Sequence, residues 1–308
     1  MSSTDGTFGD NRRLTLGTHC RPASFVQFCA GPPQILEADG TPTWIARGAN
    51  FVVAVSRVAE DAQVVQPDIP DESMLLLSPA VPVTVDTGAV TRGIGEEALA
   101  ILPPGTTRIT AHGPGLIVRI LSGNATFLRD RAANAAAYAG DVPDVAPLES
   151  WPAPPDGFGL RVYRLRDHME DVGFGRIFRS TNLMVNIFQP STAARDPARL
   201  SPHDHADFEQ GSLTLDGDFT HHLRTPWGAD RSQWRADEHL DCAGCSLVVI
   251  PPRMIHTTGW HGADARLVDI FAPPRDDFAL KARWVRNAND YPLPPRLLPG
   301  GAPDGRMA

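Results

Sequence analysis

The segment SPHDHADFEQGSLTLDGDFT, residues 201–220, contains three side chains of kinds that bind metals, all at odd-numbered positions. They are His203, His205 and Glu209. Successive side chains of a β-strand point to opposite faces, so residues two or four apart share a face. A further histidine, His256, follows a short apolar run and two prolines. Three imidazoles and one carboxylate suit a divalent first-row metal, so this set predicts one metal site.

The composition is that of an ordinary globular chain, with 42% hydrophobic and 21% charged residues among 308. A formal net charge of −8 gives no general attraction for nucleic acid or an anionic membrane, so we expect small-molecule partners. No apolar run approaches the roughly 20 residues that a membrane helix needs, and the N-terminal residues lack the apolar core of a secretory signal. These features predict a cytoplasmic protein with no membrane partner.

Four cysteines in a chain of this length do not form a disulfide framework. Cys242 and Cys245 make a CxxC, which a structural zinc, a redox pair or two ordinary cysteines in a turn would each explain. The sequence has no second pair at zinc-site spacing, which favours two ordinary cysteines.

The domain organisation follows from short apolar, β-branched runs separated by Gly, Pro, Asp and Asn, which predict an all-β fold. An Ala-rich segment at 129–139 predicts one short helix, and a Pro-rich linker follows it. We expect five regions: an N-terminal arm (1–40), a first β domain (41–128), a helix with a linker (129–158), a second β domain (159–287) and a C-terminal tail (288–308).

The two β domains repeat each other, with offsets that grow from 137 to 150 residues as insertions in surface loops would make them. The first-half positions aligned with the four predicted ligands are Gln66, Asp68, Glu72 and Arg108. Gln and Arg are poor metal ligands, so we expect a metal in the second half alone. In the first half we expect Arg108 to form ion pairs with Asp68 and Glu72 rather than a second active site.

The ligand pattern resembles the two motifs of the cupin superfamily. The matching residues are His203-x-His205-x3-Glu209 with Gly217, then Gly244, Pro251 and His256. Gly217 comes one residue later than the motif places it, and Pro251-Pro252 stands where Pro-x-Gly is usual. The resemblance covers the second half, and the repeat extends it to the first.

The chain therefore resembles a bicupin, the arrangement of oxalate decarboxylases, quercetinases and gentisate-type dioxygenases. This resemblance implies an all-β fold of two tandem cupin barrels, of the double-stranded β-helix or jelly-roll type, joined by a short helix. It also implies one metal ion inside the second barrel, held by the three histidines and by the glutamate that the gentisate group lacks. Ligand type and cellular availability favour Fe(II), with Mn(II) or Ni(II) as alternatives.

Four protein ligands on an octahedral metal leave two neighbouring positions open, which suits a bidentate substrate, or one substrate atom together with O2. Behind the ligands, we expect catalytic help from Gln210 and from either His221 or His222, since only one of two adjacent residues in a strand faces the interior. The predicted substrate-binding residues are Arg224, Arg253 and Trp227, with a surface ion pair as the alternative for Arg224.

Three classes of function agree with these features. The first expectation is an O2-using oxidoreductase of the dioxygenase type acting on a small oxygenated substrate. The second is a non-redox lyase, decarboxylase or isomerase of a sugar or organic acid, and the third is a cupin that binds a small molecule without turnover. The intact ligand set favours an enzyme but does not separate the first two classes. The arm and tail could cover sheet edges within one chain or across a homodimer.

Overall fold

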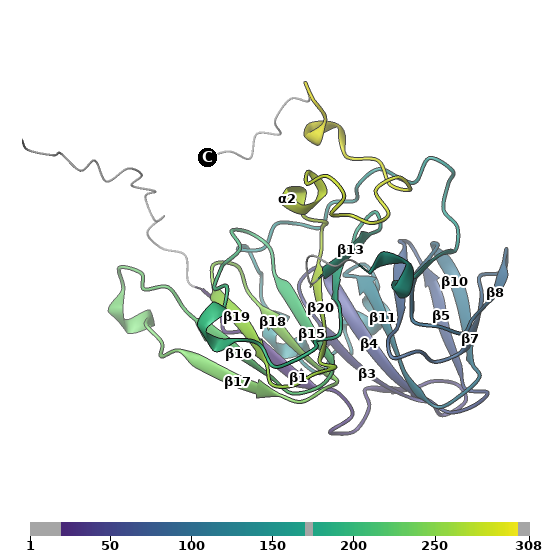
Figure 1. The fold of residues 1–308 in the computed structure, drawn as a ribbon, viewed down its shortest axis with the longest axis horizontal. Helices are drawn as coiled ribbons and strands as arrows, with labels where there is room; N and C mark the ends of the chain where they lie inside the picture. Colours follow the sequence, from purple (N-terminus) through teal and green to yellow (C-terminus); the bar gives the residue numbers. More distant parts are fainter. Residues whose placement is uncertain (1–19, 170–174, 301–308) are drawn as a thin grey trace, which may run out of the picture.

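The computed structural model describes residues 20–169 and 175–300 and is almost entirely β, as the sequence predicted (Figure 1). Two β-barrels lie side by side, each built from a large and a small antiparallel sheet. Parts of the predicted arm and tail, residues 1–19 and 301–308, lie outside the described residues.

The N-terminal barrel pairs a sheet of seven strands with one of four. In spatial order, the large sheet contains β12 (Arg161–Arg164), β9 (Ala98–Leu102), β6 (Ser73–Leu77), β11 (Gly115–Ser122), β4 (Phe51–Val58), β3 (Pro42–Arg47) and β2 (Ile35–Leu36). The small sheet contains β5 (Gln63–Ile69), β10 (Gly105–Ala111), β7 (Val83–Asp86) and β8 (Thr91–Ile94).

The C-terminal barrel pairs a sheet of six strands with one of three. The large sheet contains β1 (Ser24–Gln27), β18 (Ser246–Ile250), β15 (Gln210–Asp216), β20 (Arg266–Phe271), β14 (Met184–Phe188) and β13 (Gly175–Arg179). The small sheet contains β17 (Glu238–Cys242), β16 (Phe219–Arg224) and β19 (Ile255–Trp260).

The helices of the described residues are all short. They are α1 (Thr126–Arg129), α2 (Asp276–Ala279) and the 3₁₀ turns η1 (Ala135–Tyr138), η2 (Leu165–His168), η3 (Pro197–Arg199), η4 (Arg231–Gln233) and η5 (Pro295–Leu297). The continuous helix predicted over 129–139 is therefore wrong. Asn134 interrupts it, because its side chain accepts from the backbone N–H of Arg47 and donates to the Arg47 carbonyl.

Each barrel contains an edge strand that comes from beyond the predicted domain boundaries. In the arm, β1 pairs along its whole length with β18 of the C-terminal barrel (Figure 1). After the linker, β12 pairs with β9 of the N-terminal barrel. Both strands cover edges that would otherwise expose unpaired backbone N–H and C=O groups.

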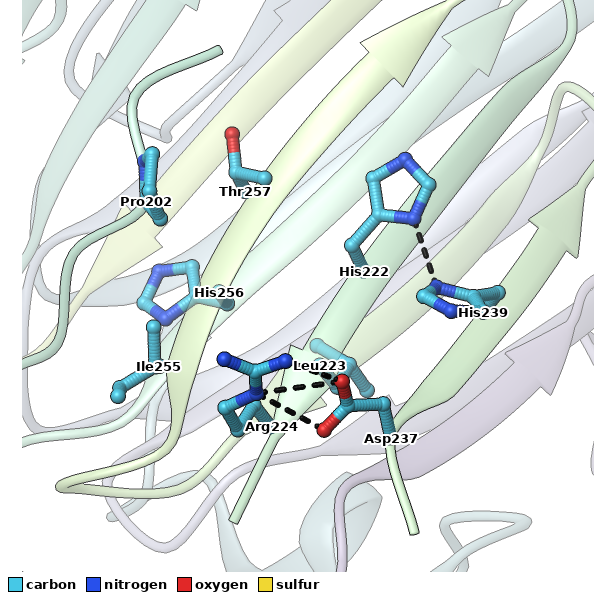
Figure 2. Close-up of a pocket in the computed structure, with 9 residues that line it drawn as sticks. All are labelled: Pro202, His222, Leu223, Arg224, Asp237, His239, Ile255, His256 and Thr257. Atoms are coloured by element: carbon cyan, nitrogen blue, oxygen red, sulfur yellow. Dashed lines mark hydrogen bonds and ion pairs between the residues drawn. The ribbon is translucent and has the colours of Figure 1, made fainter. Parts of the chain in front are cut away.

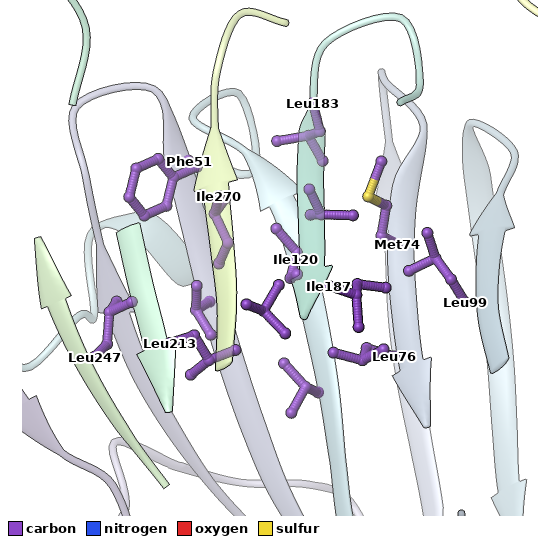
Figure 3. Packing of buried hydrophobic residues seen from close by; sticks show 14 of the residues in the cluster. Phe51, Met74, Leu76, Leu99, Ile120, Leu183, Ile187, Leu213, Leu247 and Ile270 are labelled. Carbon is purple, nitrogen blue, oxygen red and sulfur yellow. The ribbon is translucent and has the colours of Figure 1, made fainter. Parts of the chain in front are cut away.

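The largest hydrophobic core lies between the two barrels rather than inside either one (Figure 3). Its residues come from the facing large sheets, with Phe51, Met74 and Ile120 on one side and Leu213, Ile187 and Ile270 on the other. Phe51 is fully buried, so its truncation to alanine would cost about 4 kcal/mol. Gly211 is required opposite it, because a Cβ there would lie 2.7 Å from the ring.

Candidate metal centre

Three histidines converge at the C-terminal barrel, where His205 and His256 are buried and His203 is exposed. His203 and His205 lie in the segment before β15, and His256 lies in β19. The backbone N–H of His256 donates to the His203 carbonyl at 2.8 Å, and the reverse bond measures 3.1 Å. One ligand nitrogen from each of the three rings lies within 4.8 Å of the others. The structure therefore brings together three of the four predicted ligands.

Hydrogen bonds set the tautomers of two of these rings. Nδ1 of His203 donates to the Ser201 carbonyl at 2.9 Å, and Nδ1 of His256 donates to the Met254 carbonyl at 2.9 Å. A carbonyl only accepts, so each Nε2 keeps its lone pair for a metal. Burial lowers the pKa of His205 to about 3 and that of His256 to about 4, so both are neutral at pH 7. The donor set therefore fits a divalent metal.

Gln210 places a fourth ligand atom for a metal, its amide oxygen, beside the histidines. Its Oε1 lies 2.9 Å from Nε2 of His205 and 3.3 Å from Nε2 of His256. Its Nε2 donates to Oδ1 of Asp269 at 2.9 Å, which turns the amide oxygen toward the imidazoles. Asp269 is buried, and this burial raises its pKa to about 7.

Glu209 points away from the histidines, so its prediction as a metal ligand is wrong. Its Oε1 accepts from Nη2 of Arg21 at 2.7 Å and from the Tyr138 hydroxyl at 3.0 Å. Its Oε2 accepts from the backbone N–H of Ala49 at 2.6 Å. All three partners belong to the N-terminal half of the chain, so the carboxylate links the two halves.

The motif spacing agrees with this exchange of roles. Adjacent residues at the start of a strand face opposite sides, so Glu209 and Gln210 cannot both reach the interior. When the motif is counted from Gln210, the one-residue displacement of Gly217 disappears. The spacing to Gly217 is therefore the sequence signal that favours Gln210 over Glu209.

The two adjacent histidines of β16 are separated by the barrel wall. His221 is fully buried inside, where Nδ1 contacts Oγ1 of Thr258 at 2.9 Å and Nε2 has no partner among the described residues. Burial lowers its pKa to about 3. His222 lies on the outer face, where its Nδ1 is 2.8 Å from Nδ1 of His239 (Figure 2). The prediction of His222 as a catalytic residue is therefore wrong.

Two of the three predicted substrate-binding residues also lie outside the barrel. Arg224 is exposed and pairs with Asp237 at 2.6 Å (Figure 2). Trp227 is 68% exposed and stacks on Trp234 in the loop after β16. Arg253 is the exception, because its backbone N–H donates to the His205 carbonyl at 2.6 Å and so helps to hold that ligand. A substrate contact of its side chain stays a prediction.

A cavity of about 150 Å³ adjoins the histidines. Its wall includes His203, His256 and Gln210. Its wall also includes Asp269, Phe188, Arg195, Trp260, Leu267 and Arg275. Both arginines and Asp269 were not predicted from the sequence. A lone acidic residue inside the apolar run 267–271 was the available signal for Asp269, whereas the loop that carries Arg195 contained none.

The predicted ion pairs of the first half are absent from the described residues. Arg108 is exposed and donates to Oε1 of Gln63 at 3.1 Å, and Asp68 is exposed as well. Glu72 is fully buried, but it accepts from the Tyr291 hydroxyl at 2.8 Å and from the backbone N–H of Thr181 at 3.1 Å. These partners lie in the C-terminal half, so Glu72 links the halves in the opposite direction from Glu209.

The cysteines are free, and none belongs to a metal-binding group within the described part of the chain. Cys242 is buried, and Sγ of Cys245 lies 3.9 Å from Sγ of Cys29 rather than facing Cys242. Cys242 ends β17 and Cys245 lies in the turn before β18; that both are ordinary cysteines stays a prediction. Among the described residues, no helix has both the length and the apolarity needed to span a membrane. The cytoplasmic location stays a prediction.

No family model and no curated protein sequence matches the chain. Among solved structures, it is similar to protein Ylba from E. coli, with a TM-score of 0.55 and 13% identity over 84% of this chain and 93% of the other. It is also similar to an oxalate decarboxylase, with a TM-score of 0.54 and 12% identity over 84% and 81%. The oxalate decarboxylase of Lactobacillus farciminis gives 0.52 and 12% over 82% and 86%. These similarities show that the chain has the predicted two-barrel cupin fold.

Proposed function

We propose that the C-terminal barrel is a metal-dependent active site for a small, oxygenated organic substrate. The observation that carries this proposal is the convergence of His203, His205 and His256 on one point beside a polar cavity. A closed structural site would need no such cavity, whereas a catalytic site must leave room for the substrate. We propose Fe(II) as the metal, with Mn(II) or Ni(II) as alternatives.

The chain's own residues hold and surround the reacting group. The three imidazoles and the Gln210 amide oxygen are uncharged donors, so a bound divalent metal would keep its full charge and supply a strong Lewis acid for substrate oxygens. Asp269 holds the Gln210 amide in place through its hydrogen bond. His221 is buried inside the same barrel, and its Nε2 has no hydrogen-bond partner among the described residues.

The reaction type that we propose first is an O2-dependent oxidation of the dioxygenase kind. A second candidate is a non-redox decarboxylation or isomerisation, which is favoured by the carboxyl group of Asp269 in the cavity wall. The names of the oxalate decarboxylase neighbours point toward the second candidate, although similarity at 12% identity is evidence for the fold alone.

Anaerobic purification, reloading with Fe(II), Mn(II) or Ni(II), and oxygen uptake over a panel of hydroxy acids, diketones and phenols would test the proposal. The matched variants are His256→Ala and His222→Ala, which remove an inner and an outer histidine from adjacent strands. We expect only the first to lose metal and turnover. Turnover that persists without O2 would replace the first reaction type with the second. Failure of all three metals to bind the wild-type protein would overturn both.

A further inference from the structure

Arg195 places a positive charge at the cavity without a negative partner. Its Nη1 donates to the Thr258 carbonyl at 2.5 Å, and its Nη2 donates to Oγ of Ser201 at 2.9 Å. Its guanidinium carbon lies 5.0 Å above the ring of Trp260. Burial lowers the pKa of Arg195, and no carboxylate of the described residues lies within ion-pair distance of it. A guanidinium stays charged at pH 7, so this half-buried cation lacks a counter-ion.

Arg275, the other arginine of the cavity wall, is already neutralised. Its Nε and Nη2 donate to the two carboxylate oxygens of Asp277 at 3.0 and 2.8 Å. Its guanidinium also lies 3.7 Å from the centre of the Phe278 ring. A guanidinium has five N–H donors, and Arg195 uses only two of its nitrogens in hydrogen bonds to neutral groups. Arg195 is therefore the arginine that can accommodate an anion from the cavity.

A second, larger hollow of about 650 Å³ adjoins the first. The two share the side chains of Phe188, Arg195, Trp260 and Leu267. Beyond Arg195, the wall of the larger hollow includes the apolar residues Pro190, Ala193, Ala194, Phe219 and Ala265, and also polar residues, among them Asp196 and Arg199. Arg195 thus lies where the cavity beside the histidines meets these apolar side chains, which form the apolar groove.

We propose that Arg195 binds the carboxylate of the substrate and that the apolar groove holds the substrate's hydrocarbon or aromatic body. The substrate class is an organic acid with an apolar group, and its oxygenated group lies toward the histidines. The placement of the oxygenated group toward the histidines rests on the proposed function. The binding of the carboxylate by Arg195 and of the body in the groove does not rest on it, because neither contact involves a metal ligand.

The charge is tested by comparing phenylacetate with phenylacetamide, which has the same shape and no charge. Binding to the metal-free protein is measured by calorimetry and by tryptophan fluorescence, to which Trp260 beside Arg195 contributes. We expect phenylacetate to bind about 10-fold more tightly than phenylacetamide, because loss of a hydrogen bond between charged groups typically weakens binding by about this factor. Arg195→Met should abolish this preference and Arg195→Lys should restore part of it. Arg199→Met, which removes an arginine from the groove wall alone, should retain it.

Equal binding of the two probes to the wild type would overturn the proposal, as would an unchanged preference in Arg195→Met. Circular dichroism of each variant shows that it is folded, and acetate provides a further probe without an apolar body. Ala194→Trp, which fills the groove, should weaken phenylacetate about 10-fold and leave acetate unchanged. Ala198→Trp, on an exposed turn outside the groove, is its control. Equal effects of the two tryptophan variants would exclude the groove as the binding site of the body.

The failures of the two proposals are distinguishable. If His256→Ala removes metal and turnover while Arg195→Met still prefers the acid, the metal site stands and the carboxylate site is wrong. If no metal binds but the acid preference depends on Arg195, the carboxylate site stands and the metal-dependent function is wrong.

Discussion

The two barrels share a fold and differ in what fills them. The interior of the N-terminal barrel is filled mainly by an apolar core, which includes Val64, Leu75, Leu77, Val85 and Ile109. The interior of the C-terminal barrel contains buried polar groups instead, among them Gln210, Ser212, Thr214, Asn186 and Asp269. The comparison shows that one backbone supports either a packed core or a polar cavity. A few inward-facing side chains decide between them.

The strand pairing shows which residues of the two barrels correspond. Leu76 pairs with Val118 in the first barrel as Leu213 pairs with Val268 in the second. In the same alignment Ser73, Leu75 and Leu77 stand at the positions of Gln210, Ser212 and Thr214. The repeat inferred from the sequence is therefore a repeat of structure. Two of the three polar positions have become leucine.

A remnant of the second barrel's centre survives in the first. Gln66 faces Thr107 across β5 and β10, as His203 faces His256. Nε2 of Gln66 donates to Oγ of Ser73 at 2.8 Å, while Oε1 of Gln66 and Oγ1 of Thr107 have no partner among the described residues. The sequence alignment placed Arg108 on His256, one residue too far, because the loop after the prolines is longer in the second half.

The largest effect is expected when the second barrel is given the first barrel's residue. His256→Thr introduces the side chain found at Thr107 and removes one of three imidazoles. We expect the metal affinity to fall about 100-fold or more, because the remaining donors cannot enclose the ion. Metal analysis after dialysis measures this loss, with His239→Thr on the outer face as the control. Full metal content in His256→Thr would refute the proposed site.

The links between the barrels should affect stability and not metal binding. Glu209→Ala leaves the Tyr138 hydroxyl and the Ala49 N–H without their acceptor, so we expect the free energy of unfolding to fall by about 3 kcal/mol. Denaturant unfolding measures this change. Metal content should stay at the wild-type value, and Glu60→Ala on the surface should change neither quantity. Loss of metal from a folded Glu209→Ala protein would reinstate the glutamate as a ligand.

The second link should respond to pH. Burial raises the pKa of Glu72 above its ordinary value. A raised folded-state pKa contributes stability that is complete below the unfolded value of about 4.3 and is lost as the pH rises through the folded value. Relative to Glu72→Gln, the wild type should therefore lose about 3 °C of melting temperature between pH 4 and pH 8. A difference in melting temperature between the two proteins that stays constant from pH 4 to pH 8 would contradict the raised pKa of Glu72.

The smallest effect is expected in the first barrel's remnant. Gln66→Leu combined with Ser73→Ala replaces a buried, incompletely satisfied polar pair with apolar groups. We expect stability to rise by about 1 kcal/mol or less, because the orphaned amide oxygen no longer has to be desolvated. A loss of more than 2 kcal/mol in denaturant unfolding would show that this pair still has a structural role.

The sequence predicted the fold and the three histidines because both depend on regular spacing. The spacing of His203 and His205 predicted that they point the same way, although they lie before β15, where only an isolated bridge joins His203 to His256. The repeat predicted the counterpart of this barrel. The sequence could not place Glu209 and Gln210 correctly, because the short loop after His205 shifts the strand's alternation by one residue. The place of Arg195 in the cavity wall could not be predicted either, since it depends on an irregular loop that folds back onto the backbone of β19.

The contacts between the barrels limit how this protein could change over time. The C-terminal barrel contains β1, which comes from before the N-terminal barrel, and Glu72 and Glu209 cross the boundary in opposite directions. A gene shortened to the second half would lose β1, Tyr138 and the N–H of Ala49, together with the sheet that covers Leu213. The first barrel can therefore lose its ligands by mutation, yet it cannot be deleted without exposing the core on which the second depends. Its retention needs no function of its own.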